Sequence, residues 1–174
     1  MLCARHLIGR EPFAVLLSDE VIDASVPALA QLLKVYDSGN GGVLGVKKVR
    51  QSEVSQYGIV ATRRVAGDLY RVLDMVEKPS PADAPSRLAV IGRYVLSPEI
   101  FPLLEKTAPG KNREIQLTDA LRLLAQRAPM YAQEIQGQRH DAGDKLGFLK
   151  ATVEFALKNP ALGPPFSQYL KQLR

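Results

Sequence analysis

The 174-residue sequence is long enough for one domain, and its 46% hydrophobic and 24% charged residues are the mix of an ordinary globular protein. No apolar run approaches the length needed to cross a bilayer, and a single cysteine excludes an internal disulfide framework. We therefore expect a single domain over residues 1–174, no membrane partner and a cytoplasmic location.

The net charge of +5 raises the question of a nucleic-acid partner. The basic residues are spread along the chain, Trp is absent and aromatic residues make up only 6% of the sequence, unlike a nucleic-acid-binding surface. A small phosphorylated ligand would need only two or three well-placed cations. We therefore expect no nucleic acid among the partners and favour a phosphate ester.

Strand and helix patterns alternate in the first half of the chain. Residues 13–17 form a short apolar run typical of a buried parallel strand, and residues 27–36 have the apolar spacing of a helix. Residues 57–62 and 69–76 predict a hairpin that turns at Gly67 and Asp68. Residues 88–96 then predict a further strand.

The second half continues this alternation. Thr118 is suited to cap a helix that runs to about Arg127, and residues 130–135 predict a strand. Residues 137–144 are predicted to form a polar loop, and residues 145–158 an amphipathic helix. The whole pattern indicates an α/β fold, with a mixed, mostly parallel sheet that is flanked by helices and carries one inserted hairpin.

Three acidic residues follow predicted strands, where open α/β sheets bind their ligands. Asp19 and Asp141 form a plausible Mg²⁺ pair, because this ion prefers oxygen ligands and shares them with substrate phosphates. Glu77 closes the second hairpin strand, and Lys78 beside it is a candidate phosphate partner. An Asp after a strand is often only a turn former, and Glu77 with Lys78 also fits a solvated strand end. Residue spacing alone therefore indicates only an α/β domain, with phosphate binding as one open possibility.

Six segments, in the same order as in the family, resemble the bacterial UTP–glucose-1-phosphate uridylyltransferases. They are L-L-S-D-E-V-I at 16–22, Y-G-I-V at 57–60, V-E-K-P at 76–79, I-G-R-Y-V-L at 91–96, E-I-Q-L-T-D-A at 114–120 and H-D-A-G-D-K-L-G-F at 140–148. Together they cover nearly the whole chain. The segments at 91–96 and 114–120 point to the uridylyl rather than the thymidylyl branch of the family.

The resemblance implies a Rossmann-like nucleotidyltransferase fold and a reaction. The family joins UTP and glucose 1-phosphate to give UDP-glucose and pyrophosphate, with Mg²⁺ as cofactor. The sugar phosphate attacks the α-phosphorus of UTP directly, so catalysis consists mainly of positioning and charge neutralisation. Asp19 and Asp141 match the metal-binding aspartates, and with Lys78, which matches the lysine on the sugar phosphate, they are the implied catalytic residues.

The resemblance also implies a set of substrate-binding residues. Glu77 matches the carboxylate that accepts hydrogen bonds from the glucose hydroxyls. Gly58 matches a glycine whose backbone lies close to the sugar, and Gly92 is expected to leave room for the ligand on the same floor. Lys145 is expected to reach a phosphate from the start of its helix.

One family segment has no counterpart in this sequence. The family begins with a G-x-G-T-R-x-x-P-x-T-K loop that holds the nucleotide, so the resemblance implies the C-terminal, sugar-binding part of the enzyme. We expect negligible activity from the chain alone, and self-association through an exposed apolar edge at residues 13–17. The alternatives are a non-catalytic remnant that binds a sugar nucleotide or a partner chain, and a nucleotidylyltransferase for another sugar phosphate, such as a dTTP-using one.

Overall fold

The computed structural model describes residues 1–37, 41–110 and 114–173, which fall into two compact units. The sheet unit comprises Met1–Leu16 and Val26–Gln136, and the helical unit comprises Leu17–Ser25 and Gly137–Arg174. The expectation of a single domain stays a prediction. Over the described ranges, none of the helices combines the length and the apolar character that a bilayer crossing requires.

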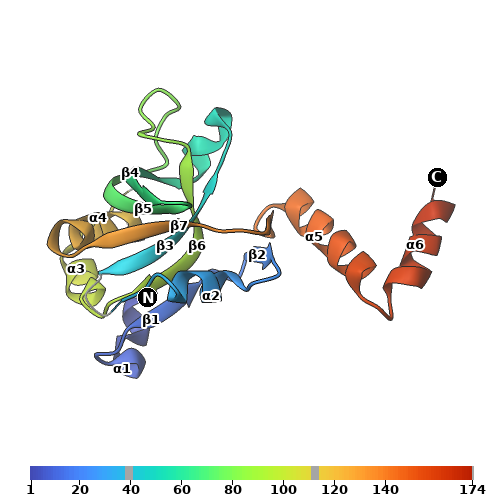
Figure 1. The fold of residues 1–174 in the computed structure, drawn as a ribbon, viewed down its shortest axis with the longest axis horizontal. Coiled ribbons are helices and arrows are strands. Elements are labelled where there is room, and N and C mark those ends of the chain that lie inside the picture. Colours follow the sequence, from blue (N-terminus) through green and yellow to red (C-terminus); the bar gives the residue numbers. More distant parts are fainter. Residues whose placement is uncertain (38–40, 111–113, 174) are drawn as a thin grey trace. The chain divides into compact units, whose positions relative to one another are not determined.

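The sheet unit contains six strands and short helices between them (Figure 1). In chain order its elements are η1 (Leu2–Ala4), α1 (Arg5–Ile8), β1 (Phe13–Leu16), α2 (Ala28–Leu33), β3 (Gly42–Lys48), η2 (Gln51–Gln56), β4 (Gly58–Ala66), β5 (Leu69–Glu77), β6 (Leu88–Leu96), α3 (Ile100–Lys106), α4 (Leu117–Arg127) and β7 (Met130–Glu134).

The sheet has the strand order β1-β6-β3-β7-β5-β4, with an additional contact between β6 and β4. The α/β class is confirmed, but the prediction of a mostly parallel sheet was wrong. Within the described residues only β3 and β7 run parallel, and the other neighbours are antiparallel. The reason is that the β4–β5 hairpin, rather than a crossover helix, connects β3 to β6, so β6 returns in the opposite direction.

The core lies between the sheet and two helices, α3 and α4, which lie side by side against one face (Figure 1). Phe101 of α3 and Leu121 and Leu124 of α4 are almost fully buried there. They pack in one cluster with strand residues such as Leu44 and Val72. Apolar burial of this kind, at about 25 cal/mol per Å², is the main source of stability for the unit.

Strand β1 forms one end of the sheet and pairs, among the described strands, with β6 alone. Phe13 stacks on Phe101 with ring centroids 5.0 Å apart, whereas Leu16 is 51% exposed. The expectation of a fully buried parallel strand was therefore wrong, and the exposed edge is confirmed.

Strand β5 contains one extra residue relative to β4, because the pairing shifts between Ala61 opposite Asp74 and Thr62 opposite Val72. Buried residues accordingly change phase along β5: Val72 precedes the irregularity and Met75 follows it. A bulge of this kind reverses which face the later side chains occupy. Glu77, at the end of β5, consequently points to the face covered by α4.

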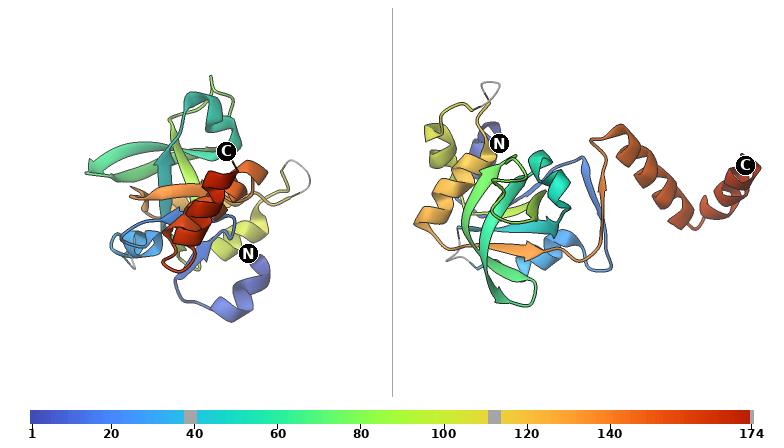
Figure 2. Two further views of the ribbon diagram at one scale, coloured as in Figure 1. Left: turned by 90° about the vertical axis from the view of Figure 1, so that its right-hand side faces the viewer. Right: turned by 90° about the horizontal axis from the view of Figure 1, so that it is seen from above.

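The helical unit consists of a two-stranded antiparallel ribbon followed by two helices, α5 and α6, joined by a short turn (Figure 2). The polar loop expected over residues 137–144 is wrong in part, because residues 138–141 pair with residues 20–23 as a strand. Asp144 caps α5 by accepting a hydrogen bond from the backbone N–H of Gly147 at 2.8 Å. The elements are β2 (Glu20–Asp23), β8 (Gln138–Asp141), α5 (Lys145–Lys158) and α6 (Gly163–Gln172).

We predict that Gly42→Ala destabilises the sheet unit far more than Gly67→Ala. A Cβ at residue 42 would lie 2.8 Å from the carbonyl oxygen of Val95, a backbone atom that cannot move away, so we expect a loss of about 2–3 kcal/mol. Gly67, with φ of 50°, has open space around it, and only its backbone conformation opposes Ala, at about 1 kcal/mol. Urea unfolding of both variants measures the difference, and equal losses would contradict the packing described for β3.

Candidate functional site

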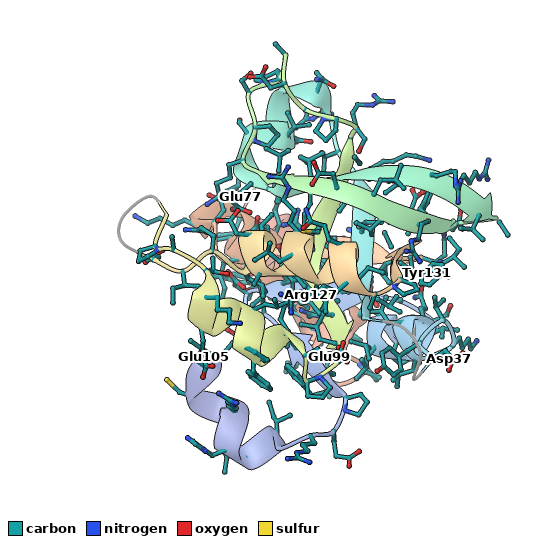
Figure 3. The ribbon with its side chains drawn as sticks, turned by 90° about the vertical axis from the view of Figure 1, so that its left-hand side faces the viewer. Asp37, Glu77, Glu99, Glu105, Arg127 and Tyr131 are labelled. Atoms are coloured by element: carbon teal, nitrogen blue, oxygen red, sulfur yellow. The ribbon has the colours of Figure 1, made fainter. Side chains whose placement is uncertain are left out.

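Glu77 is held at the junction of the β4–β5 hairpin with α4. Thr118 donates a hydrogen bond from Oγ1 to Oε2 of Glu77 at 2.5 Å, and Gly58 is the direct cross-strand neighbour of Glu77. A Cβ on Gly58 would lie 3.2 Å from both of these oxygens, so a glycine leaves them the space they occupy. Glu77, the last residue of β5, lies next to the N-terminal end of α4 (Figure 3). The carboxylate is therefore fixed in position, with a side chain that is still 27% exposed to a ligand.

The role expected for Thr118 was wrong. The residue that precedes the first turn of α4 is Gln116, and it makes no side-chain capping bond. Thr118 lies one position inside the helix and directs its hydroxyl to Glu77 instead. A capping side chain accepts a hydrogen bond from a backbone N–H of the first turn, which needs a residue just before the helix; Thr118, inside the helix, instead donates its hydroxyl to the charged Glu77.

Lys78 combines an unusual backbone with an exposed amine. Its φ of 47° is the only positive value among the described residues other than glycine, and its N–H donates to the carbonyl oxygen of Tyr57 at 3.0 Å. Such a conformation costs about 1–2 kcal/mol and persists where the surroundings impose it. The Nζ atom lies 3.9 Å from Oε1 of Glu77, and the side chain is 62% exposed. A cation and a carboxylate are thus presented together at the end of β5.

Gly92 is buried in β6, where the pairing with β3 is irregular between Leu44 and Val46. Its φ of 63° is one that side chains rarely adopt, so the glycine allows this irregularity to form. Its expected place on the floor of a sugar site stays a prediction.

Asp19 and Asp141 are brought together in the helical unit. Asp141 ends β8, and the residue after it, Ala142, donates its backbone N–H to the carbonyl oxygen of Asp19 at 2.7 Å. A Cβ on Gly143 would lie 2.9 Å from Oδ2 of Asp19 and 3.3 Å from Oδ1 of Asp141. The two carboxylates therefore flank the same glycine, although Asp141 is the last residue of β8 rather than part of the expected loop; their role as metal ligands stays a prediction.

Arg139 balances part of this negative charge. Its guanidinium donates two hydrogen bonds to Glu20 at 2.5 Å and one to Oδ2 of Asp141 at 3.1 Å. The side chains of Arg139 and Glu20 are only 15% and 12% exposed, whereas that of Asp141 is 39% exposed. Arg139 thus fixes Oδ2 of Asp141, while Oδ1 accepts a hydrogen bond from the backbone N–H of Gly143 at 3.1 Å.

The pair of aspartates fits the ligand preference of Mg²⁺. Only oxygen donors are offered, and three carboxylates against one guanidinium leave a negative excess near residue 143. In the described ranges no three His, Cys, Asp or Glu side chains converge as a metal-binding group. Magnesium is commonly held by one or two carboxylates and completed by waters and substrate phosphates, so two aspartates are sufficient.

Lys145 is the first residue of α5 and is exposed. It follows the capping residue Asp144, so it is at the start of its helix as predicted, but its reach to a phosphate stays a prediction. The sequence-predicted residues therefore form two groups, each within its own unit: Gly58, Glu77 and Lys78 in one, and Asp19, Asp141 and Lys145 in the other.

Two residues that support the site were missed from the sequence. Thr118 was visible in the E-I-Q-L-T-D-A segment, but its helical spacing suggested only a cap. Arg139 and its partner Glu20 carry no sequence signal, because their pairing joins residues 119 positions apart through the β2–β8 ribbon. Only the register of that ribbon brings them together.

A family model described as nucleotidyl transferase matches residues 1–157. The chain belongs to the nucleotidyl transferase family. Among curated relatives, UTP–glucose-1-phosphate uridylyltransferase YngB of Bacillus subtilis (strain 168) is 47% identical over 173 residues, which are 99% of this chain and 58% of the relative. A UTP–glucose-1-phosphate uridylyltransferase of Staphylococcus epidermidis is 44% identical over 170 residues, 98% of this chain and 59% of the relative.

Solved structures give the same picture for the fold. A UDP-glucose pyrophosphorylase complexed with UDP-glucose matches with a TM-score of 0.86 at 41% identity, over 91% of this chain and 61% of the other. A UTP-bound UGPase from Acinetobacter baumannii matches with a TM-score of 0.87 at 37% identity, over 99% of this chain and 60% of the other. The chain therefore spans about 60% of the length of these relatives.

We predict that Arg139→Gln destabilises the β2–β8 ribbon. The carboxylate of Glu20 is mostly buried, and the substitution removes the positive charge that pairs with it. We expect the ribbon to lose about 2–3 kcal/mol of stability. Lys158→Gln is the matched control, because it removes an ion pair of the same unit, with Asp23, from an exposed position. Hydrogen exchange of the amides in β2 and β8 measures both effects, and equal protection in the two variants would refute the role given to Arg139.

Proposed function

We propose that the chain takes part in uridylyl transfer from UTP to glucose 1-phosphate, a reaction that yields UDP-glucose and pyrophosphate. The observation that carries this proposal is the Glu77–Thr118–Gly58 arrangement, which presents an oriented carboxylate beside an exposed lysine. The names of the relatives, at 44–47% identity, support UTP and glucose 1-phosphate as the substrates.

In this proposal Glu77 and Lys78 bind the sugar phosphate. The carboxylate of Glu77 accepts hydrogen bonds from hexose hydroxyls, and Thr118 keeps one of its oxygens turned to α4. The amine of Lys78 pairs with the phosphate. Both groups orient the nucleophile, and holding the reactants in place supplies a large part of the rate enhancement in such transfers.

Asp19 and Asp141 would hold Mg²⁺, with Arg139 fixing the orientation of Asp141. When bound, the cation neutralises the charge that develops on the transferring phosphate oxygens. Lys145, at the start of α5, would add a positive charge near a phosphate. No residue of the chain is proposed to form a covalent intermediate.

We predict that Glu77→Gln weakens UDP-glucose binding by about 10-fold or more, since hydrogen bonds to a charged group are worth about 1.5–3 kcal/mol. Isothermal titration calorimetry with UDP-glucose and Mg²⁺ measures the loss. Glu105→Gln is the control: it removes the same charge from an exposed position on α3. Unchanged affinity in Glu77→Gln would remove the main support for a sugar-nucleotide ligand.

The same titration tests the metal proposal. We predict that Mg²⁺ strengthens UDP-glucose binding in the wild type and that Asp141→Asn removes this dependence. Asp23→Asn, in the same β2–β8 ribbon, keeps the dependence because Asp23 pairs with Lys158. A Mg²⁺ dependence that survives in Asp141→Asn would exclude this aspartate as a metal ligand.

We also propose that the chain self-associates through the edge of β1, because an unpaired strand edge with an exposed Leu16 offers backbone groups to a second copy. Sedimentation velocity is expected to show concentration-dependent association that Leu16→Lys reduces. Leu7→Lys is the control, since Leu7 is 90% exposed on α1 and not on the edge. A monomer at every concentration would contradict this proposal.

A cytoplasmic location stays a prediction.

A further inference from the structure

The outer face of the β4–β5–β7 region carries a shallow hollow of about 420 Å³. Its lining comes from alternate residues of adjacent strands, which is the pattern of side chains on one face of a sheet. Volumes of this size are typical of sites for small molecules. The lining residues are Arg63 and Val65 of β4, Arg71 and Leu73 of β5, and Tyr131 of β7.

Three of these residues form one row across the strands. Arg63 is the direct cross-strand partner of Arg71, and Arg71 is the partner of Tyr131. The guanidinium of Arg71 lies over the ring of Tyr131, 5.5 Å from its centroid. Two like charges directly opposite each other on antiparallel strands destabilise the pairing. The row therefore concentrates positive charge at a cost to the sheet.

No carboxylate offsets this charge within the described part of the chain. None of the lining residues is acidic, and neither guanidinium has a hydrogen bond or an ion pair with a described residue. Other arginines of the sheet unit do have such partners: Arg122 binds Asp74, and Arg50 binds Glu53. Arg63 and Arg71 thus lie side by side in this hollow without a counter-charge from the described residues.

Apolar surface flanks the arginines. Val65 and Leu73 are 53% and 58% exposed, and both line the hollow. An anion with an apolar or ring-shaped portion would contact these side chains and remove their surface from water. A phosphate group matches the other half of the hollow, because two arginines can each donate a fork of hydrogen bonds to it.

We propose that this hollow is a second ligand site, which binds a small phosphorylated molecule through Arg63 and Arg71. The organic portion of the ligand rests on Val65 and Leu73. The site is separate from Glu77: the extra residue in β5 places Arg71 and Glu77 on opposite faces, and Tyr131 lies beyond the other end of α4 (Figure 3). It does not depend on the proposed uridylyl transfer.

The test is a titration with inorganic phosphate and with phenyl phosphate at constant ionic strength, followed by the Nε–Hε NMR signals of the arginines. We expect saturable shifts of Arg63 and Arg71, and a loss of affinity of at least about 10-fold in Arg63→Gln/Arg71→Gln. Arg64→Gln/Arg87→Gln is the control, which removes the same charge from exposed arginines outside the hollow. Equal weakening in the control, or shifts that rise linearly in all arginines alike, would overturn the proposal.

Two further readouts keep the proposal testable if the double variant does not fold. Phenyl phosphate is expected to bind about 5- to 10-fold more tightly than inorganic phosphate in the wild type, because its ring covers apolar surface. Leu73→Ser should remove that preference, and equal affinities in the wild type would refute the apolar part of the site.

Without ligand, Arg63→Gln is expected to raise the melting temperature by about 1 °C through relief of like-charge repulsion. A lower melting temperature would show that the two arginines do not repel.

Discussion

The extra residue in β5 decides the chemistry of the sheet unit, because it sets the face on which Glu77 lies. Without the shift after Val72, Glu77 would share the outer face with Arg71. With it, the carboxylate meets Thr118 at the first turn of α4, in the space that Gly58 leaves open. One irregularity of the ladder thus separates an acidic group suited to sugar hydroxyls from a basic row suited to an anion.

In the helical unit, the negative charge of three carboxylates is only partly balanced by a positive side chain. Glu20, Asp141 and Asp19 lie around one end of the ribbon, and a single, mostly buried arginine neutralises part of their charge. Breaking a mostly buried pair is costly, so Arg139 is held firmly and in turn holds Asp141. The remaining oxygens beside Gly143 keep a negative field that a divalent cation would satisfy. The stability of the ribbon and the proposed cation binding therefore depend on the same few contacts.

Local pattern was sufficient to predict most elements from the sequence. The hairpin around Gly67 and the strand that ends at Leu96 were both found, since turn residues and apolar runs are local signals. Strand direction was predicted wrongly, because it depends on which strands pair, and β6 runs in the opposite direction to β3 after the hairpin. The candidate residues came from positions after strands together with a family resemblance. Thr118 and Arg139 could not be given their roles, because both act through contacts with residues distant in the sequence.

The most direct test of the central claim is a double-mutant cycle between Thr118 and Glu77, measured as UDP-glucose affinity. If the hydroxyl acts by orienting the carboxylate, Thr118→Val weakens binding by about 5- to 10-fold in the wild type, Thr118→Ser retains most of it, and Thr118→Val has almost no further effect beside Glu77→Gln. Losses that simply add in the double variant would contradict the account, because they would show that Thr118 and Glu77 act independently.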